Sequence, residues 1–361
     1  SVGEPDFMTP APIKEAGKKA IDDNFSKYSP VPGYPALRNA ISKKLKAENG
    51  LDYAASEIIV GTGGKQGVCN AIMALVNPGD EVIIPAPYWV SYPQMVKLAG
   101  GNPVIISAGI EQDFKITADQ LEASITPKTK MIILCSPSNP TGSVYTKAEL
   151  DELAKVVISH EDVFVLSDEI YEHINYIGKH ASIAACPNMK ERTIICNGVS
   201  KAYAMTGWRL GWVAAPEWIV KGLNKLQGQY TSGTSSVSQM AALAAYEGDQ
   251  QCVEDFRKTF QRRRDLIVNL AKGIPGLEVN IPQGAFYLFP KCSSFFGKSN
   301  GKYTINNSTD LAMYLLEEGH VATVGGDDFG SPDCFRMSYA TSDDNIKEAL
   351  QRIKDALSKL K

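Results

Sequence analysis

Short apolar runs alternate with longer amphipathic segments through the first three quarters of the chain. Runs of β-branched and aliphatic residues indicate buried strands, and segments with an apolar repeat near 3.6 residues indicate helices. Strands are expected at 57–60, 81–85, 103–106, 131–135, 163–167, 193–196 and 211–214. Helices are expected at 35–49, 66–76, 91–99, 118–125, 147–160, 237–246 and 254–272.

Uninterrupted apolar strands separated by amphipathic helices predict an α/β fold, with a mostly parallel sheet that helices cover on both faces. After about residue 270 the regular alternation of strands and helices ends. Strands are then expected at 277–281, 285–289 and 335–339, and helices at 308–318 and 343–360. This second pattern predicts a smaller α+β domain.

The composition narrows the class of partner. The 361 residues include 37 basic and 40 acidic side chains, interspersed along the chain, for a net charge of −3. This balance argues against nucleic acid or an anionic membrane as the main partner, and no apolar run is long enough to cross a bilayer. Seven scattered cysteines without CxxC spacing indicate neither a disulfide framework nor a zinc site. We therefore expect a small-molecule partner, a cytoplasmic location, and native residues preceding Ser1.

One lysine, one arginine and one aspartate carry the strongest chemical signal. Lys201 lies eight residues before Arg209 among small side chains, downstream of Asp168 at the end of an apolar strand. A lysine that holds pyridoxal phosphate (PLP) as a Schiff base needs an acid for the ring nitrogen and a cation for the phosphate. The three residues fit these roles. The structural alternatives are a helix N-cap for Asp168 and a surface ion pair for Arg209.

Three further segments indicate a site in the same part of the fold. The glycine-rich segment 61–67 follows a strand and opens a helix, where backbone N–H groups favour an anion, although a simple tight turn would have the same composition. Segment 136–142 is a strong turn signal after a buried strand. Arg336 lies on an alternating strand, so it is either a solvated side chain or a carboxylate clamp.

The histidines carry no such signal. His160, His173, His180 and His320 have no metal-ligand spacing, so we expect them at helix ends or on the surface and predict no metal site.

Eight motifs in series resemble class I aminotransferases of fold type I, and more narrowly the bacterial aspartate aminotransferases. They are residues 3–7, Tyr28 with Gly33 and 37–38, 63–66, 87–92, 139–142, 167–171, 200–209 and 335–339. The resemblance implies a large PLP-binding domain at 12–270 and a small domain made of 1–11 and 271–361. It also implies a homodimer, in which Tyr28 reaches the phosphate of the neighbouring subunit.

The resemblance implies a role for each matched residue. For the cofactor, Lys201 carries PLP and shuttles a proton, Asp168 pairs with the ring nitrogen, and Tyr171 and Asn139 contact the ring oxygen. Trp89 stacks on the ring, and Arg209 with Gly63, Gly64 and Lys65 surrounds the phosphate. For the substrate, Arg336 and Asn139 bind the α-carboxylate, and Gly3 contributes a backbone contact at the mouth of the active site. The implied reaction moves the amino group of L-aspartate to 2-oxoglutarate by a ping-pong mechanism.

Two departures bear on substrate choice and phosphate binding. No arginine occurs between Arg209 and Arg257, the region of the second arginine of animal-type aspartate enzymes, so Lys65 is the candidate for the distal carboxylate. The alternative is that Lys65 faces the solvent or neighbours the phosphate. Gly198 stands where the animal-type pattern has a phosphate-binding serine. A prephenate or aromatic aminotransferase is the closest alternative function, followed by a PLP-dependent β-lyase and a PLP-binding regulatory module.

Overall fold

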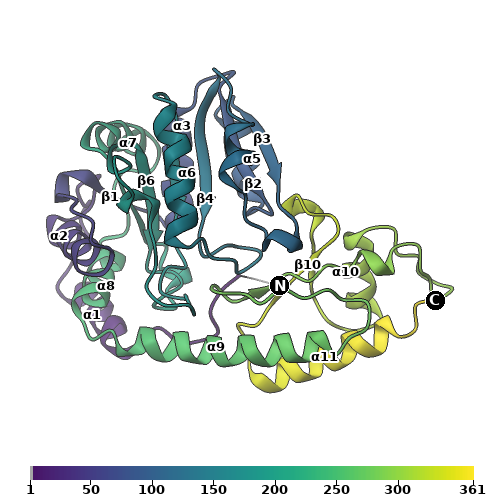
Figure 1. Ribbon diagram of the computed structural model, residues 1–361. Helices are drawn as coiled ribbons and strands as arrows, with labels where there is room; N and C mark the ends of the chain where they lie inside the picture. Colours follow the sequence, from purple (N-terminus) through teal and green to yellow (C-terminus); the bar gives the residue numbers. More distant parts are fainter. Residues whose placement is uncertain (1–2) are drawn as a thin grey trace.

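The computed structural model describes residues 3–361 and is built around a seven-stranded sheet (Figure 1). Its strands are β1 (Ile58–Gly61), β2 (Glu81–Ala86), β3 (Asn102–Ser107), β4 (Thr129–Cys135), β5 (Phe164–Asp168), β6 (Thr193–Gly198) and β7 (Gly211–Ala214), in the order β1-β7-β6-β5-β4-β2-β3. Only β7 runs antiparallel to its neighbours. The predicted mostly parallel sheet is confirmed.

The two faces of the sheet are covered by different helices because alternate side chains of each strand point to opposite sides. On β4, Met131 and Ile133 pack in one apolar cluster, and Ile132 and Leu134 pack in another. The first cluster includes side chains of α3 (Gly64–Leu75), α4 (Ser91–Leu98) and α7 (Glu217–Tyr230), and the second includes side chains of α5 (Ala118–Glu122) and α6 (Lys147–Ser159).

A third cluster covers the sheet edge at β1 and β7. It combines α1 (Ala11–Asp22), α2 (Pro35–Lys44), the π-helical turn Leu45–Asn49 and α8 (Ser236–Glu247). Short 3-10 turns lie at Ala55–Glu57, Ile110–Gln112, Ile183–Ala185, Lys190–Arg192, Thr206–Trp208, Ser293–Phe295 and Asp327–Phe329.

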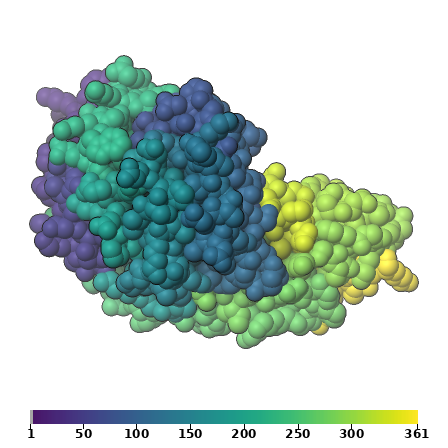
Figure 2. All heavy atoms as spheres, turned by 45° about the horizontal axis from the view of Figure 1, so that its top comes forward, coloured from purple at the N-terminus to yellow at the C-terminus, as the bar shows by residue number. Residues whose placement is uncertain are grey.

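The C-terminal part is a smaller α+β unit with its own core. Strands β8 (Tyr287–Leu288), β10 (Phe335–Ser338) and β9 (Val324–Gly325) form an antiparallel sheet in that order, packed with α9 (Gln251–Lys272), α10 (Ser308–Glu317) and α11 (Asp343–Leu357). Helix α9 runs along the base of both parts in Figure 1. Figure 2 shows the C-terminal part as a lobe beside the larger body. Because α9 is continuous across both parts, the boundary near residue 270 stays a prediction.

The structure corrects several element predictions. The strand expected at 277–281 is absent except for an isolated bridge from Glu278 to Lys291, and the strand at 285–289 shrinks to β8. Helices α1 and α7 were not expected. Both contain glycines that dilute the helical pattern, and Gly17 of α1 is required because a Cβ there would lie 2.8 Å from the ring of Trp208.

Two further observations concern the predicted class of protein. Within residues 3–361, no helix combines the length and apolarity needed to cross a membrane. All seven cysteines are free thiols.

Candidate active site

A cavity of about 440 Å³ opens at the carboxyl ends of the parallel strands, where it meets the C-terminal part. Except for Gly63 and Tyr28, every residue predicted for the site lines this cavity: Gly3, Gly64, Lys65, Trp89, Asn139, Asp168, Tyr171, Lys201, Arg209 and Arg336. Ligands of α/β proteins bind at such strand ends. Residues separated by more than 300 positions in the chain therefore share one site.

Lys201 lies in the turns that follow β6, and its amine points into the cavity. The amine donates a hydrogen bond to the carbonyl of Gly3. Burial lowers the pKa of Lys201 to about 8, with Arg209 and Arg336 acting in the same direction and Glu4 and Asp168 opposing them. A lysine with a lowered pKa is more often neutral near pH 7, and the neutral amine is the form that attacks a carbonyl.

Asp168 ends β5 with only 7% of its surface exposed. It accepts hydrogen bonds from the hydroxyl of Tyr92 at 2.7 Å and from the backbone N–H of Ile170 at 3.3 Å. Burial raises the pKa of Asp168 to about 6, although the bond from Tyr92 opposes this rise. No helix begins after Asp168, so the N-cap alternative is wrong.

The sequence predicts no role for Tyr92, although the residue lies within the motif 87–92. The available signal was spacing. Trp89 lies just before α4, and the N–H of Tyr92 in the first turn of that helix donates a 3.0 Å hydrogen bond to the carbonyl of Trp89, so this turn brings the two aromatic residues together. Their ring centroids lie 5.3 Å apart.

An anion cradle forms where the N-terminus of α3 meets Arg209. Gly63, just before α3, has a φ of +86°, and a Cβ at this position would lie 2.5 Å from Nη2 of Arg209. Glycine therefore allows the guanidinium to approach the first N–H groups of the helix. Arg209 is oriented by a 2.9 Å hydrogen bond from Nη1 to the carbonyl of Thr206. A guanidinium beside a helix N-terminus suits a phosphate.

The departure at Gly198 also has a structural reason. A Cβ at this position would lie 2.7 Å from the Cα of Gly211 and 2.9 Å from the carbonyl oxygen of Leu210. Strands β6 and β7 approach too closely here for a serine, so the phosphate side must do without that hydroxyl.

Arg336 reaches the cavity from β10, and it is a buried residue with 9% exposure. Its Nη1 donates a 2.8 Å hydrogen bond to Oδ1 of Asn139, from the turn after β4. The guanidinium lies 4.7 Å from the ring centroid of Tyr287 and 5.0 Å from that of Phe329. The solvated alternative for Arg336 is therefore wrong. Its fixed fork matches the geometry of a carboxylate.

Tyr287 is a site residue that sequence reasoning missed. Its hydroxyl lies 2.8 Å from the hydroxyl of Tyr171, and both tyrosines line the cavity. The surrounding strand was expected, but alternation alone does not say which side of a two-residue strand faces a ligand.

Lys65 and Tyr28 are both exposed, but only Lys65 belongs to the cavity. The Lys65 amine lies 5.1 Å from the ring centroid of Trp89, at the cavity wall. Tyr28 is 99% exposed and lies between α1 and α2, away from the cavity lining. Its contact with a neighbouring subunit stays a prediction.

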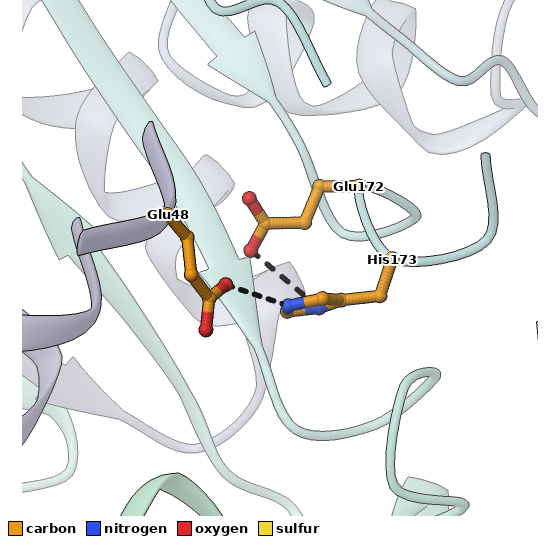
Figure 3. Close-up of side chains that lie close together, drawn as sticks. All are labelled: Glu48, Glu172 and His173. Carbon is orange, nitrogen blue, oxygen red and sulfur yellow. Dashed lines mark hydrogen bonds and ion pairs between the residues drawn. The ribbon is translucent and has the colours of Figure 1, made fainter. Parts of the chain in front are cut away.

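A second cluster of titratable side chains lies outside this cavity (Figure 3). Nε2 of His173 is 2.8 Å from Oε2 of Glu48, and Nδ1 of the same ring is 3.7 Å from Oε1 of Glu172. These groups are close enough to hold a metal ion, but the ammonium of Lys44 is hydrogen-bonded to Glu172 and lies 3.5 Å from Glu48. Lys44 therefore already supplies a cation to this cluster.

His180 lies next to this cluster, and its predicted surface location is wrong. Only 6% of its side chain is exposed, and the carboxylates of Glu169 and Glu172 lie close to its ring. His160 is the C-cap residue of α6 and His320 is exposed, as predicted.

Comparison with known proteins agrees with this geometry. A family model described as aminotransferase class I and II matches residues 1–353. The chain belongs to the class I and II aminotransferase family, which confirms the resemblance seen in its motifs and the fold expected from them.

Individual relatives narrow this class. The chain is 49% identical over 367 residues to the bifunctional aspartate aminotransferase and glutamate/aspartate-prephenate aminotransferase of Petunia hybrida, covering 100% of this chain and 76% of the petunia protein. It is also 49% identical to the aspartate/prephenate aminotransferase of Cereibacter sphaeroides, covering 97% of this chain and 88% of that protein. The crystal structure of the aspartate aminotransferase from Rhizobium meliloti superposes with a TM-score of 0.97 at 46% identity, covering 100% of this chain and 91% of that one.

Proposed function

We propose that the chain is a PLP-dependent aspartate aminotransferase, which moves the amino group of L-aspartate to 2-oxoglutarate and releases oxaloacetate and L-glutamate. One observation carries the proposal. A single cavity contains an amine with a lowered pKa, a buried carboxylate without an ion-pair partner among residues 3–361, an anion cradle and a buried arginine fork. The names of the relatives support the same reaction.

The residues present fit PLP. The anion cradle at Gly63, Gly64 and Arg209 suits its phosphate, Asp168 suits its ring nitrogen, and the aromatic surface of Trp89 suits its ring. When bound, PLP supplies an electron-withdrawing ring that spreads negative charge from the substrate Cα. Asp168 keeps the proton on the ring nitrogen, which strengthens that withdrawal.

Two further groups act on the substrate itself. Arg336, held by Asn139, binds the α-carboxylate and fixes the orientation of the Cα–H bond. Lys201 Nζ would then take the proton from Cα and donate it to the C4′ carbon of bound PLP, and the second half of the reaction would run the same transfer in reverse. Because Cα and the amine must lie in reach of one another, orientation by Arg336 and proton transfer by Lys201 depend on the same small cavity.

Lys65 is the proposed partner of the distal carboxylate. It is the one lysine besides Lys201 that lines the cavity in the described chain. Prephenate is the second candidate acceptor, since two relatives carry it in their names and prephenate also has two carboxylates. A cation at the mouth therefore suits both acids, and it does not favour an aromatic amino acid with an uncharged side chain.

We also propose a homodimer in the cytoplasm, with Tyr28 contributing to the partner's phosphate site. Support comes from the complete exposure of this tyrosine in a single chain. Sedimentation of the PLP-bound protein tests the dimer. Tyr28→Phe should then weaken PLP binding without changing the sedimentation coefficient.

A panel of amino donors with 2-oxoglutarate tests the substrate assignment. Aspartate should give the highest kcat/KM, and a preference for phenylalanine or alanine would contradict the proposal. A parallel panel of acceptors with aspartate compares 2-oxoglutarate and prephenate directly.

Lys65→Ala sharpens this test. The substitution should raise the KM for aspartate about tenfold, equivalent to ~1.4 kcal/mol, and leave the KM for phenylalanine unchanged. Lys97→Ala, on the exposed side of α4, is the matched control and should change neither.

A further inference from the structure

Glu169, directly after Asp168, belongs to a buried charged network on the other side of β5. Asp168 lines the active-site cavity, whereas Glu169 does not and is only 1% exposed. Its Oε1 accepts hydrogen bonds from Ser167 at 2.9 Å and Ser182 at 2.5 Å. Its Oε2 lies 3.1 Å from Nε2 of His180. A carboxylate buried this deeply needs a cation or several donors, and here it has both.

His180 is the cation. Burial by itself would lower its pKa, but the carboxylates of Glu169 and Glu172 outweigh burial and raise it, while Lys44 opposes them. Both ring nitrogens of His180 and Oε2 of Glu169 are buried without a hydrogen bond among the described residues, so the 3.1 Å approach of Nε2 to Oε2 is an ion-pair contact and charge is the interaction that joins the two side chains. The imidazolium form therefore neutralises the carboxylate next to Asp168.

The network continues to Glu172 and Lys44. Glu172 accepts hydrogen bonds from Lys44, from Asn197 at 2.8 Å and from Asn49 at 3.0 Å. Burial would raise the pKa of Glu172, but Lys44, His173 and His180 hold it well below its usual range. Glu172 is thus charged and already compensated, so His180 remains available to Glu169.

A cavity of about 770 Å³ reaches this network from outside the active site. Glu172, His173 and His180 line it, together with residues of α9. His180 therefore borders a cavity other than the substrate cavity.

We propose that Glu169 and His180 are positioning residues for the cofactor: the imidazolium neutralises Glu169, so that Asp168 keeps the negative charge required by the ring nitrogen. The inference rests on the proposed function, since it assumes that Asp168 faces that nitrogen. Two negative charges on consecutive residues disfavour one another. The charge of Glu169 raises the pKa of Asp168 even in the intact network. The other titratable groups that face Asp168 are Tyr92, Cys135, Cys196 and Lys201.

Two probes separate this effect from ordinary structural damage. The first is PLP, and the second is 1-deaza-PLP, in which a C–H group replaces the ring nitrogen. Only PLP gains from a negative charge on Asp168. Dissociation constants of both probes are measured with apoprotein between about pH 6 and 8.5, a range that includes the pKa values of Asp168 and free histidine.

His180→Gln should weaken PLP binding about tenfold near neutral pH and leave 1-deaza-PLP binding within about twofold. A tenfold loss corresponds to one pKa unit, so the pH below which PLP affinity falls should rise by about one unit. Glu169→Gln with His180→Gln removes both charges of the pair and should restore PLP affinity to near the wild-type value. Glu169→Gln alone should not raise the pH below which PLP affinity falls. If His180→Gln does not fold, this single variant still tests the inference.

Three outcomes would overturn the inference. The first is an equal loss for both probes in His180→Gln, which would mark a purely structural role. The second is a double variant that binds PLP no better than His180→Gln. The third is unchanged PLP binding in His180→Gln while the wild type still prefers PLP to 1-deaza-PLP. If the wild type does not prefer PLP, the assignment of Asp168 in the proposed function fails as well.

Discussion

Asp168 and Glu172 are almost equally buried, with exposed fractions of 7% and 6%, but their pKa values are shifted in opposite directions. Glu172 has the ammonium of Lys44 beside it, and its pKa lies well below the usual range. Asp168 has a hydroxyl and a backbone N–H but no ion-pair partner among residues 3–361, and its pKa is raised to about 6. Burial is therefore common to both, and the difference lies in the partner. A structural carboxylate is compensated within the chain, whereas a carboxylate that serves a ligand is left for the ligand's cation.

The same contrast separates the two lysines. Lys44 contacts the carboxylates of Glu172 and Glu48 and donates a hydrogen bond to the amide oxygen of Asn49. Among residues 3–361, by contrast, Lys201 donates only to the carbonyl of Gly3, and its pKa is lowered. Four substitutions test the comparison, from the largest expected effect to the smallest.

Lys201→Ala should lower aminotransferase activity by at least about 10⁴-fold, because the covalent anchor and the proton-transfer group are both removed. The visible absorbance of the covalently bound cofactor should disappear, and the free energy of unfolding of the apoprotein should change little. Absorbance spectra, steady-state kinetics and denaturant unfolding measure the three quantities. Retained visible absorbance would contradict the assignment of Lys201.

Asp168→Asn should lower kcat/KM by about 10³-fold, since an amide cannot balance a protonated ring nitrogen. The apoprotein should be at least as stable as the wild type, because a buried charge without a cation is removed. Kinetics of the PLP-bound protein and thermal unfolding of the apoprotein check both parts. A clear loss of apoprotein stability would mean that Asp168 is structural, like Glu172.

Lys44→Ala should have the opposite effect, with a large loss of stability and a small loss of activity. Removing the cation leaves Glu172 buried and under-compensated, so the free energy of unfolding should fall by about 3 kcal/mol. Activity per folded molecule should change far less than in the two preceding variants. Urea unfolding measures the loss, and Lys46→Ala is the control because the Lys46 side chain is 71% exposed. An unchanged midpoint for Lys44→Ala would remove the distinction between the two carboxylates.

Tyr92→Phe should have the smallest effect and should appear mainly in the pH dependence. The hydroxyl lowers the pKa of Asp168, so its loss should raise that pKa above about 6. Because Asp168 loses its charge as the pH falls through its pKa, PLP affinity should begin to fall at a higher pH, with a loss of about threefold near pH 7. Tyr88→Phe removes a hydroxyl from the same motif and serves as the control. Identical pH profiles for the two variants would contradict the role of Tyr92.

Much of the site could be predicted because its residues lie in short motifs at strand ends. Asp168 follows an apolar strand, and Lys201 lies in a turn with Arg209. In both cases a local sequence pattern carries a side chain whose chemistry points to one role in binding a cofactor. Tyr287 and Tyr92 were missed because their roles depend on which side chain they touch, Tyr171 in one case and Asp168 in the other. His180 was misplaced for the same reason, since its burial is produced by residues on other elements.

The amino-acid sequence by itself determined the α/β class, the order of the strands along the chain and the set of candidate side chains, because these follow from local periodicity and residue chemistry. Only the tertiary structure decided which charges are compensated. Lys44 and Glu172 are 128 positions apart, and Arg336 and Asn139 are 197 apart, so no local pattern records either pair. A buried carboxylate with a cation beside it is structural, and one without such a cation can bind the cation of a ligand. Tertiary packing decides between the two, because it brings the cation from elsewhere in the chain.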